Sequence, residues 1–276
     1  MQKIVAHCLV KNEERFIKYS LMSALNYVDE IMVWDTGSTD ETKCLISNVQ
    51  CSMNGKKIKF REAGDVDAVS FTEMRNKMLM ETSKEFDWLM ILDGDEIWPV
   101  KSIKTVIQYI NSHPETESIV VRTHNLVGDI YHKMPESSGH YHLAGQAGHL
   151  NLRFINLRKI PGLNVQKPHG QQGYYDGDGT LVQDREPKKI KFLDVHYAHA
   201  THLQRSNSRD NDLMVIKRGL KMKYEWGERI AQADIPEVLL NNTNFTQAPL
   251  DFWIKAAIFT WPRRLKRWLF PAKDGY

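Results

Sequence analysis

A short apolar strand that runs directly into a cluster of carboxylates is the feature that most constrains this chain. The four apolar residues Leu89–Leu92 follow Phe86 and Trp88 and precede Asp93-Gly94-Asp95-Glu96. Such a run favours a buried strand. Like charges this close repel one another unless a cation or hydrogen-bond donors neutralise them. The pattern predicts either a site for Mg²⁺ or Mn²⁺ carrying nucleotide phosphates, or a solvated Asp-Gly turn.

Strands alternate with helices from the N-terminus up to this acidic segment. The expected strands span residues 4–10, 30–34, 57–61 and the run before Asp93, and helical patterns lie at 16–25, from 41 onward and at 71–83. This alternation predicts an α/β fold with a mostly parallel, doubly wound sheet, whose ligands lie beyond the carboxyl ends of the strands. Because Asp35, Asp93 and Asp95 follow such strands, we favour the metal and nucleotide site over the turn.

The chain beyond residue 100 is less regular. A helix is expected at 103–110, strands at 118–123, 151–156 and 190–196, and a further helix at 208–226. Residues 124–179 are rich in histidine and glycine and carry the weakest structural signal.

Composition sets only broad limits on function. The 276 residues suit one large α/β domain with a smaller appended element, and a net charge of +3 is too small to indicate nucleic-acid binding by itself. Cys8, Cys44 and Cys51 have no zinc or redox spacing, and the N-terminus lacks the apolar core of a signal peptide. No window reaches the ~18 apolar residues of a membrane span. We therefore expect a cytoplasmic protein.

Four segments in the first ~100 positions resemble motifs of the family 2 glycosyltransferases, which have the GT-A fold. Residues 10–15 (VKNEER) resemble the opening loop, 33–42 (VWDTGSTDET) the second motif, and 71–76 (FTEMRN) the start of a helix. Residues 93–96 (DGDE) fall where the family has its DxD motif. The resemblance implies a metal-dependent transferase that binds a nucleotide sugar.

The resemblance also implies roles for individual residues. Asp95 is the direct metal ligand, with Asp93 near the ion or the ribose. Asp35 faces the base, and Arg75 reaches toward the base or diphosphate, although a surface helix charge is the alternative for Arg75. The residues expected to contact the nucleotide are Val10, Asn12, Glu13, Asp35, Arg75, Asp93 and Gly94.

A third metal ligand is expected from the histidines near residue 196. Residues 195–199 (VHYAH), followed by 209–211 (RDN), resemble an element of a subgroup that modifies bacterial surface polysaccharides, in which a histidine lies near the metal. Imidazole readily joins carboxylates around Mn²⁺. His196 is the predicted ligand and His199 the reserve, while a structural role is the alternative for His196.

The catalytic base is where the sequence departs from that subgroup. Gly170 stands where the relatives have a glutamate. An inverting transferase needs a group that takes the proton from the acceptor hydroxyl. The candidates are Asp178 and Asp176, with His169 behind them, although the two aspartates are equally typical of a glycine-rich turn.

Residues 250–270 mix tryptophan with basic residues, including Trp253, Trp261, Arg263 and Arg264. Basic amphipathic helices of this kind lie on anionic membranes, which would place the protein peripherally on the inner face of the membrane. A core-packing helix is equally expected, and a nucleic-acid contact ranks third.

Taken with the resemblance, these features predict an inverting, metal-dependent glycosyltransferase. It would move a sugar from a nucleotide-diphosphate donor, UDP-linked, to a hydroxyl of a glycan or a lipid-linked saccharide. The alternatives are a transferase for modified bases of DNA and an inactive nucleotide-sugar-binding module, the latter suggested by Gly170. The expected domain is 1–205, with a nucleotide-binding half (1–100) and an acceptor half (101–205), followed by a helical extension over 206–276.

Overall fold

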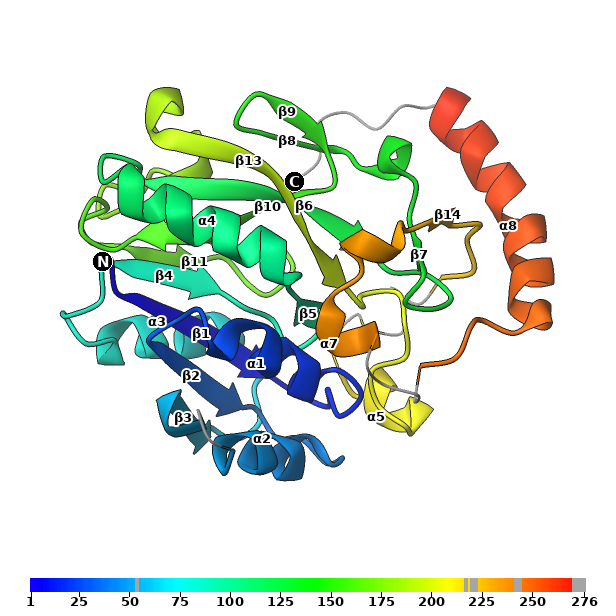
Figure 1. Ribbon diagram of the computed structural model, residues 1–276, viewed down its shortest axis with the longest axis horizontal. Coiled ribbons are helices and arrows are strands. Elements are labelled where there is room, and N and C mark those ends of the chain that lie inside the picture. Colours follow the sequence, from blue (N-terminus) through cyan, green and yellow to red (C-terminus); the bar gives the residue numbers. More distant parts are fainter. Residues whose placement is uncertain (53–54, 216–217, 219–222, 241–244, 270–276) are drawn as a thin grey trace.

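The computed structural model describes residues 1–52, 55–215, 218, 223–240 and 245–269. Its centre is an eight-stranded sheet in the order β3-β2-β1-β4-β10-β6-β13-β5 (Figure 1). The strands β3, β2, β1 and β4 are parallel, as are β6 and β13, whereas β10 runs antiparallel to both of its neighbours. The strand bounds are β1 Ile4–Val10, β2 Glu30–Asp35, β3 Ile58–Glu62, β4 Trp88–Ile91, β5 Glu96–Ile97, β6 Ser118–Asn125, β10 Leu150–Asn156 and β13 Ile190–His199.

Helices cover both faces of the sheet because successive residues of each strand point to opposite sides. One core joins Ala6 and Cys8 of β1 to buried residues of α1 (Ile17–Leu25), α2 (Thr42–Gln50) and α4 (Val100–Ser112). The other joins Val5 and Leu9 to α3 (Ser70–Glu81) and to the hairpin of β11 (Asn164–Gln166) and β12 (Gly173–Tyr175). Figure 1 shows α1, α2 and α4 together on the near face.

The mostly parallel α/β fold predicted from the sequence is confirmed. Through residue 97, each expected strand and helix is present with ends shifted by a few residues at most. The expected helix at 208–226 is wrong in extent, because α5 spans Arg209–Leu213 and its end is held by side-chain bonds of Asp212. The rest of that expected helix lies partly outside the described residues.

The C-terminal part contains more than helices. β14 (Glu228–Arg229) pairs with β7 (His132–Lys133), and α7 (Glu237–Leu240) and α8 (Leu250–Leu269) follow. A separate hairpin consists of β8 (Tyr141–Leu143) and β9 (Gln146–Gly148). Within the described ranges, every helix is too short or too polar to span a lipid bilayer. The predicted domain boundary at residue 205 stays a prediction.

The parallel register brings the ends of three strands to one edge. Val10 at the end of β1 pairs with Asp35 at the end of β2, and β4 on the other side of β1 leads into Asp93. Between the two aspartates of the acidic turn, a Cβ on Gly94 would lie 2.9 Å from Val10 Cγ1 and 3.0 Å from Glu13 Cγ. The glycine therefore lets the acidic turn pack closely against the end of β1.

A buried histidine in β1 gives the fold a dependence on pH. His7 is 1% exposed, and its Nε2 forms a 2.8 Å hydrogen bond with Thr82 Oγ1. Burial and the nearby charge of Arg75 lower the pKa of His7 to about 3.

The substitution His7→Gln is expected to reduce the sensitivity of the fold to acid. Below the ordinary pKa of 6.5 the unfolded chain takes up a proton on His7, whereas the folded protein does not until the pH nears 3. Protonation of His7 in the unfolded chain therefore lowers the free energy of unfolding as the pH falls from 6.5 toward 3. Between about pH 7.5 and pH 5.5, the free energy of unfolding of the wild type should fall by about 1.4 kcal/mol more than that of the variant in urea titrations. Equal pH dependence of the two proteins would contradict this assignment.

Candidate active site

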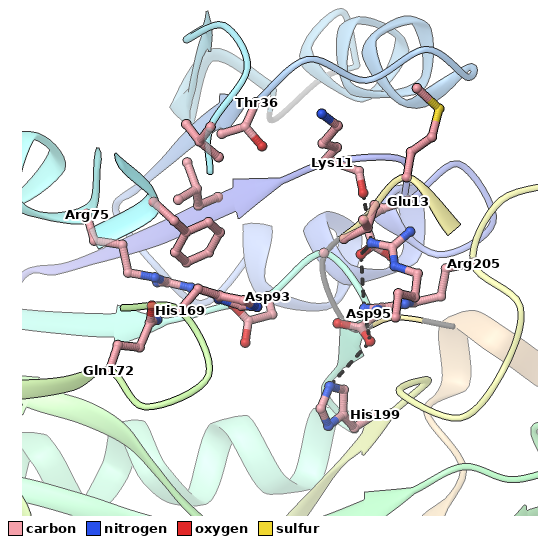
Figure 2. Close-up of a pocket in the computed structure, with 17 residues that line it drawn as sticks. Lys11, Glu13, Thr36, Arg75, Asp93, Asp95, His169, Gln172, His199 and Arg205 are labelled. Carbon is pink, nitrogen blue, oxygen red and sulfur yellow. Dashed lines mark hydrogen bonds and ion pairs between the residues drawn. The ribbon is translucent and has the colours of Figure 1, made fainter. Parts of the chain in front are cut away.

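A cavity opens at the carboxyl ends of β1 and β4 (Figure 2). It is bounded by the loop after β1, the acidic turn, α3, the loop at 169–172, the end of β13 and the segment that follows it. The polar residues that line it are Lys11, Glu13, Thr36, Arg75, Asp93, Asp95, His169, Gln172, His199, Arg205 and Arg218.

Arg205 bridges two carboxylates at the floor of this cavity. Its Nη1 lies 2.6 Å from Asp95 Oδ2 and 3.0 Å from Glu13 Oε1. His199 approaches the same oxygen of Asp95, with Nε2 at 3.3 Å. Burial opposes ionisation of Asp95, but the charge of Arg205 and the contact with His199 outweigh it and hold the pKa of Asp95 well below its usual range. Asp95 is therefore a fixed negative charge at neutral pH.

Asp93 belongs to a second group of ion pairs. Arg75 Nη2 donates to Asp93 Oδ1 at 2.8 Å, and Arg153 Nη2 lies 3.6 Å from Asp93 Oδ2. Burial opposes ionisation, yet the two guanidinium groups lower the pKa of Asp93. Arg153 also binds Glu96, which is fully buried. Because 32% of the Asp93 side chain is exposed, Asp93 faces the cavity whereas Glu96 lies beneath it.

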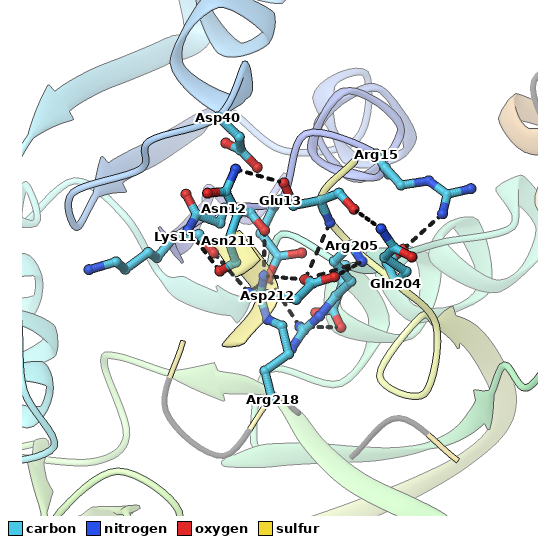
Figure 3. Close-up of polar contacts among 12 residues, drawn as sticks. Lys11, Asn12, Glu13, Arg15, Asp40, Gln204, Arg205, Asn211, Asp212 and Arg218 are labelled. Carbon is cyan, nitrogen blue, oxygen red and sulfur yellow. Dashed lines mark hydrogen bonds and ion pairs between the residues drawn. The ribbon is translucent and has the colours of Figure 1, made fainter. Parts of the chain in front are cut away.

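Residues 204–215 and Arg218 pack against the loop that follows β1 (Figure 3). Arg218 Nη2 donates to Lys11 O at 2.8 Å and also binds Glu13. Its Nη1 lies 3.1 Å from Oδ1 of Asp212, a carboxylate with no exposed surface. The side chain of Arg218 is itself only 2% exposed. Two residues distant in sequence from the acidic turn, Arg205 and Arg218, therefore form one wall of the cavity.

Asn12 connects three parts of the site. Its Nδ2 donates to Asn211 O at 3.0 Å, and its Oδ1 accepts from Thr39 N at 2.8 Å. Asn12 has no exposed surface and a φ of 53°, in the left-handed region where asparagine is favoured over most residues with a side chain. It therefore joins the loop after β1, the turn after β2 and α5.

Asp35 shapes the turn after β2. Its Oδ1 accepts from Gly37 N at 3.1 Å and from Ser38 N at 2.9 Å. Gly37 has a φ of 84°, and a Cβ there would lie 2.2 Å from the Asp65 carboxylate. Among the residues that the structure describes, the buried Oδ2 of Asp35 has no hydrogen-bond partner. Leaving this oxygen unpaired costs free energy, which a ligand that donates a hydrogen bond would relieve.

The buried charges around the cavity leave a surplus of negative charge. Five carboxylates contact four guanidinium groups: Glu13, Asp93, Asp95, Glu96 and Asp212 against Arg75, Arg153, Arg205 and Arg218. Burial raises the pKa of Glu13 to about 8, against the charges of Arg205 and Arg218. Burial also raises the pKa of Glu96 well above its usual range, so protons on Glu13 and Glu96 can balance this surplus without a cation.

The donor atoms beside Asp95 are of the kind that bind divalent cations. His199 Nε2 lies 3.3 Å from Asp95 Oδ2 and its Nδ1 lies 3.2 Å from Asn125 Oδ1, so both ring nitrogens have a protein partner. With its hydrogen on Nδ1, the ring would present Nε2 to a cation bound at Asp95. Carboxylates with an imidazole oriented in this way are typical ligands of Mn²⁺. In the described part of the chain, no three His, Cys, Asp or Glu side chains are yet close enough together to hold an ion. Arg205 is the cation in contact with Asp95.

The sequence model of the family described as "Glycosyl transferase family 2" matches residues 9–165, which is more than half of the chain. The chain belongs to this family. The match spans the loop after β1, the acidic turn and α3, so it includes one side of the cavity, whereas His169, His199 and Arg205 lie beyond it. The GT-A fold expected from the sequence motifs is confirmed with it. No curated protein matches this glycosyltransferase.

Several solved structures are similar to this glycosyltransferase. Residues 1–349 of TarS from S. aureus are 14% identical, with a TM-score of 0.46, over 72% of this chain and 61% of that chain. Glucosyl-3-phosphoglycerate synthase from Mycobacterium tuberculosis is 17% identical, with a TM-score of 0.44, over 87% and 92%. The mannosyltransferase PcManGT from Pyrobaculum calidifontis is 12% identical, with a TM-score of 0.43, over 73% and 58%. The glycosyltransferase thus covers less than two thirds of the TarS fragment.

The structure brings most of the predicted nucleotide contacts to the cavity of the glycosyltransferase. Glu13, Arg75, Asp93 and Gly94 line it. The other three predicted contacts, Val10, Asn12 and Asp35, lie behind its wall. Val10 O accepts from Thr36 N at 2.8 Å, so this strand end holds the next loop in place.

The expectation for His196 is corrected by the structure. His196 Nε2 lies 3.0 Å from Asp234 O, and its ring stacks on that of His124 with centroids 3.9 Å apart. His196 and His199 are an odd number of residues apart in β13, so their side chains point to opposite faces of the sheet. His199, the reserve candidate, is the histidine that lies beside Asp95.

The three candidate bases lie in different surroundings. Asp176 Oδ1 accepts from the backbone N–H groups of Asp178 and Thr180 at 3.1 and 2.8 Å, and its Oδ2 is bound by Arg185. Asp176 thus holds a turn and does not line the cavity. Asp178 is exposed on the same turn, also away from the cavity lining. His169 alone of the three lines the cavity.

Three basic residues that complete the site were not predicted from the sequence. Arg205 and Arg218 contact Glu13, and Arg153 contacts Asp93 and Glu96. The sequence signal for Arg205 was its position shortly after the His-rich strand end, which shares an edge with the acidic turn.

Proposed function

We propose that this glycosyltransferase moves a sugar, with inversion, from a UDP-linked donor to a hydroxyl of a glycan or lipid-linked saccharide. The observation that supports this most strongly is the convergence of Arg75, Asp93, Asp95 and His199 on one cavity at the carboxyl edge of the sheet. Carboxylates that could hold a cation and a guanidinium group that could pair with phosphate oxygens therefore line the same cavity.

The donor would lie with its nucleoside near the turn after β2 and its diphosphate near α3. Thr36 lines the cavity at this end, and the unpaired Oδ2 of its neighbour Asp35, behind the wall, would accept from a base N–H group that reaches it. Lys11 and Arg75 line the same cavity and provide positive charge for the diphosphate, with the guanidinium of Arg75 fixed by its 2.8 Å bond to Asp93.

Asp95, His199 and Asp93 are the residues that would hold Mg²⁺ or Mn²⁺. When bound, such an ion neutralises the diphosphate leaving group. The ionised state of both aspartates at neutral pH, maintained by Arg205 and Arg75, suits them to this role.

His169 is the base that we propose for the acceptor hydroxyl. Its ring packs against that of Phe71 with centroids 4.5 Å apart, and its backbone N–H donates to Ala68 O at 2.8 Å, so its orientation is fixed. An imidazole in the cavity wall can take the hydroxyl proton as that oxygen attacks the anomeric carbon from the face opposite the leaving nucleotide. Attack from that face inverts the anomeric configuration.

The test is a transfer assay with a panel of nucleotide sugars, Mn²⁺ and saccharide acceptors. We expect release of nucleoside diphosphate, fastest from a UDP-sugar, and an NMR spectrum of the product that shows the inverted anomer. Failure of every donor to bind or to react would overturn the proposal. Donor binding without release from any acceptor mixture would instead identify an inactive binding module.

His169→Gln and Asp178→Asn form a matched pair for the assignment of the base. His169→Gln should lower the transfer rate about 10²–10⁴-fold while calorimetry shows unchanged donor affinity. Asp178→Asn should retain the wild-type rate because Asp178 lies outside the cavity. The opposite pattern would assign the base to Asp178 and leave the donor proposal intact.

A further inference from the structure

Helix α8 is anchored to the protein by one face. The ring of Trp253 contacts His132 edge-on with centroids 4.6 Å apart, and Thr260 Oγ1 accepts from Trp226 N at 2.7 Å. Ala256 and Thr260 are buried on the same side. Figure 1 shows α8 along the outer edge of the molecule, beside β7 and β14. The inner face of α8 therefore packs against the rest of the protein.

The opposite face of α8 exposes a continuous row of large apolar side chains. Each is between 52% and 78% exposed: Leu250, Ile254, Ile258, Trp261, Leu265 and Leu269. Their spacing of three and four residues places them on one arc of about 100° along the whole helix. We call these six residues the apolar row. An exposed contiguous row of this length is typical of an interaction surface.

Positive charge accompanies the apolar row. The sequence of α8 contains five basic residues and one acidic residue. Arg263 and Arg267 share a single carboxylate, that of the buried Glu225, at 3.1 and 2.9 Å. Arg264 is exposed next to Leu265 of the row. Lys255 lies 3.3 Å from the only acidic side chain of the helix, Asp251, so the described part of α8 carries net positive charge beside the apolar row.

We infer that α8 docks the protein on an anionic lipid bilayer, with the helix in the plane of the surface and the apolar row among the acyl chains. A row of apolar side chains flanked by basic ones is complementary to acyl chains beneath anionic headgroups. A nucleic acid would match the charges but would leave the apolar row in water. A second copy of the chain would bring two positive faces together. The inference does not depend on the donor or on the catalytic base.

The test is flotation of the full chain with two kinds of vesicle, phosphatidylcholine alone and phosphatidylcholine with roughly a quarter of phosphatidylglycerol. We expect binding to the anionic vesicles only, weakened by salt. The double variant Ile258→Asp, Trp261→Asp should bind at least about tenfold more weakly, since both charges would enter the acyl region. Both replaced side chains are exposed, so circular dichroism and thermal unfolding should match the wild type.

Met80→Asp is the matched control, because Met80 is 84% exposed but lies on α3. It should float like the wild type. Absence of flotation, or equal flotation of the wild type and the double variant, would overturn the inference. The inference would also fail if the wild type sedimented as a dimer and the double variant as a monomer, because the apolar row would then contact a second copy. If the wild type and the double variant bound DNA and Arg264→Gln did not, the surface would be assigned to nucleic acid.

Discussion

Replacement of Arg205 by glutamine is expected to lower the free energy of unfolding by about 3–5 kcal/mol in metal-free buffer. Arg205 is 9% exposed and contacts the carboxylates of Asp95 and Glu13, which are 2% and 5% exposed. Removing the guanidinium leaves Asp95 with His199 alone and Glu13 with Arg218 alone, and the cost of a poorly compensated buried charge on Asp95 exceeds the value of the original pair. Chemical denaturation in the presence of EDTA measures this loss.

The same substitution should make stability depend on divalent metal. With Arg205 absent, Asp95 and His199 are free to contact Mn²⁺, so the midpoint of thermal unfolding of Arg205→Gln should rise on addition of Mn²⁺ by more than that of the wild type. Arg205→Lys is the matched control, because it keeps the charge but loses the fork of donors, and it should lose less stability and respond less to Mn²⁺. An Arg205→Gln protein as stable as the wild type in EDTA would refute the role of Arg205 as counterion.

The acidic turn and its partner on α3 could be predicted because their signals are local. Asp93 and Asp95 end a buried strand, Arg75 lies in the first turns of a helix, and parallel strands bring such ends to one edge. These residues do line one cavity. Arg205 and Arg218 had no comparable signal, because their contacts with Asp95 and Glu13 span 110 and 205 residues of the chain. No periodicity in sequence encodes a contact of that range.

A local irregularity in β13 prevents prediction from the sequence of the sheet face on which His196 lies. β13 shifts register against β6 between Leu193 and His196, so alternation counted from the start of the strand does not indicate which face His196 occupies. Asp176 shows a different limit. The pattern Asp-Gly-Asp-Gly at 176–179 is compatible with a base and with a turn, and only the contact with Arg185 distinguishes them. In both cases the deciding interaction comes from another element of the fold.

Asp95→Asn is expected to reduce kcat/KM for transfer by about 10²-fold or more. Asparagine keeps the shape of the side chain and an oxygen that can accept from Arg205, but it removes the negative charge that would hold a divalent cation against the diphosphate. The loss should therefore be largest at low Mn²⁺ concentration, with the half-saturating Mn²⁺ concentration raised, as measured by initial rates across a Mn²⁺ titration.

The partner substitution Asp93→Asn separates metal binding from the positioning of Arg75. Asp93 Oδ1 accepts a hydrogen bond from Arg75, so neutralising Asp93 should loosen Arg75 and weaken binding of the nucleotide sugar, seen as a higher KM. The half-saturating Mn²⁺ concentration should change less than it does in Asp95→Asn. Combining Asp95→Asn with Arg205→Gln should recover part of the stability that Arg205→Gln loses, since the buried carboxylate that loses its guanidinium partner is then replaced by a neutral amide. If Asp95→Asn changed neither the Mn²⁺ titration nor the rate, Asp95 would be a structural partner of Arg205 alone, and the role of the acidic turn in binding the metal would have to pass to Asp93.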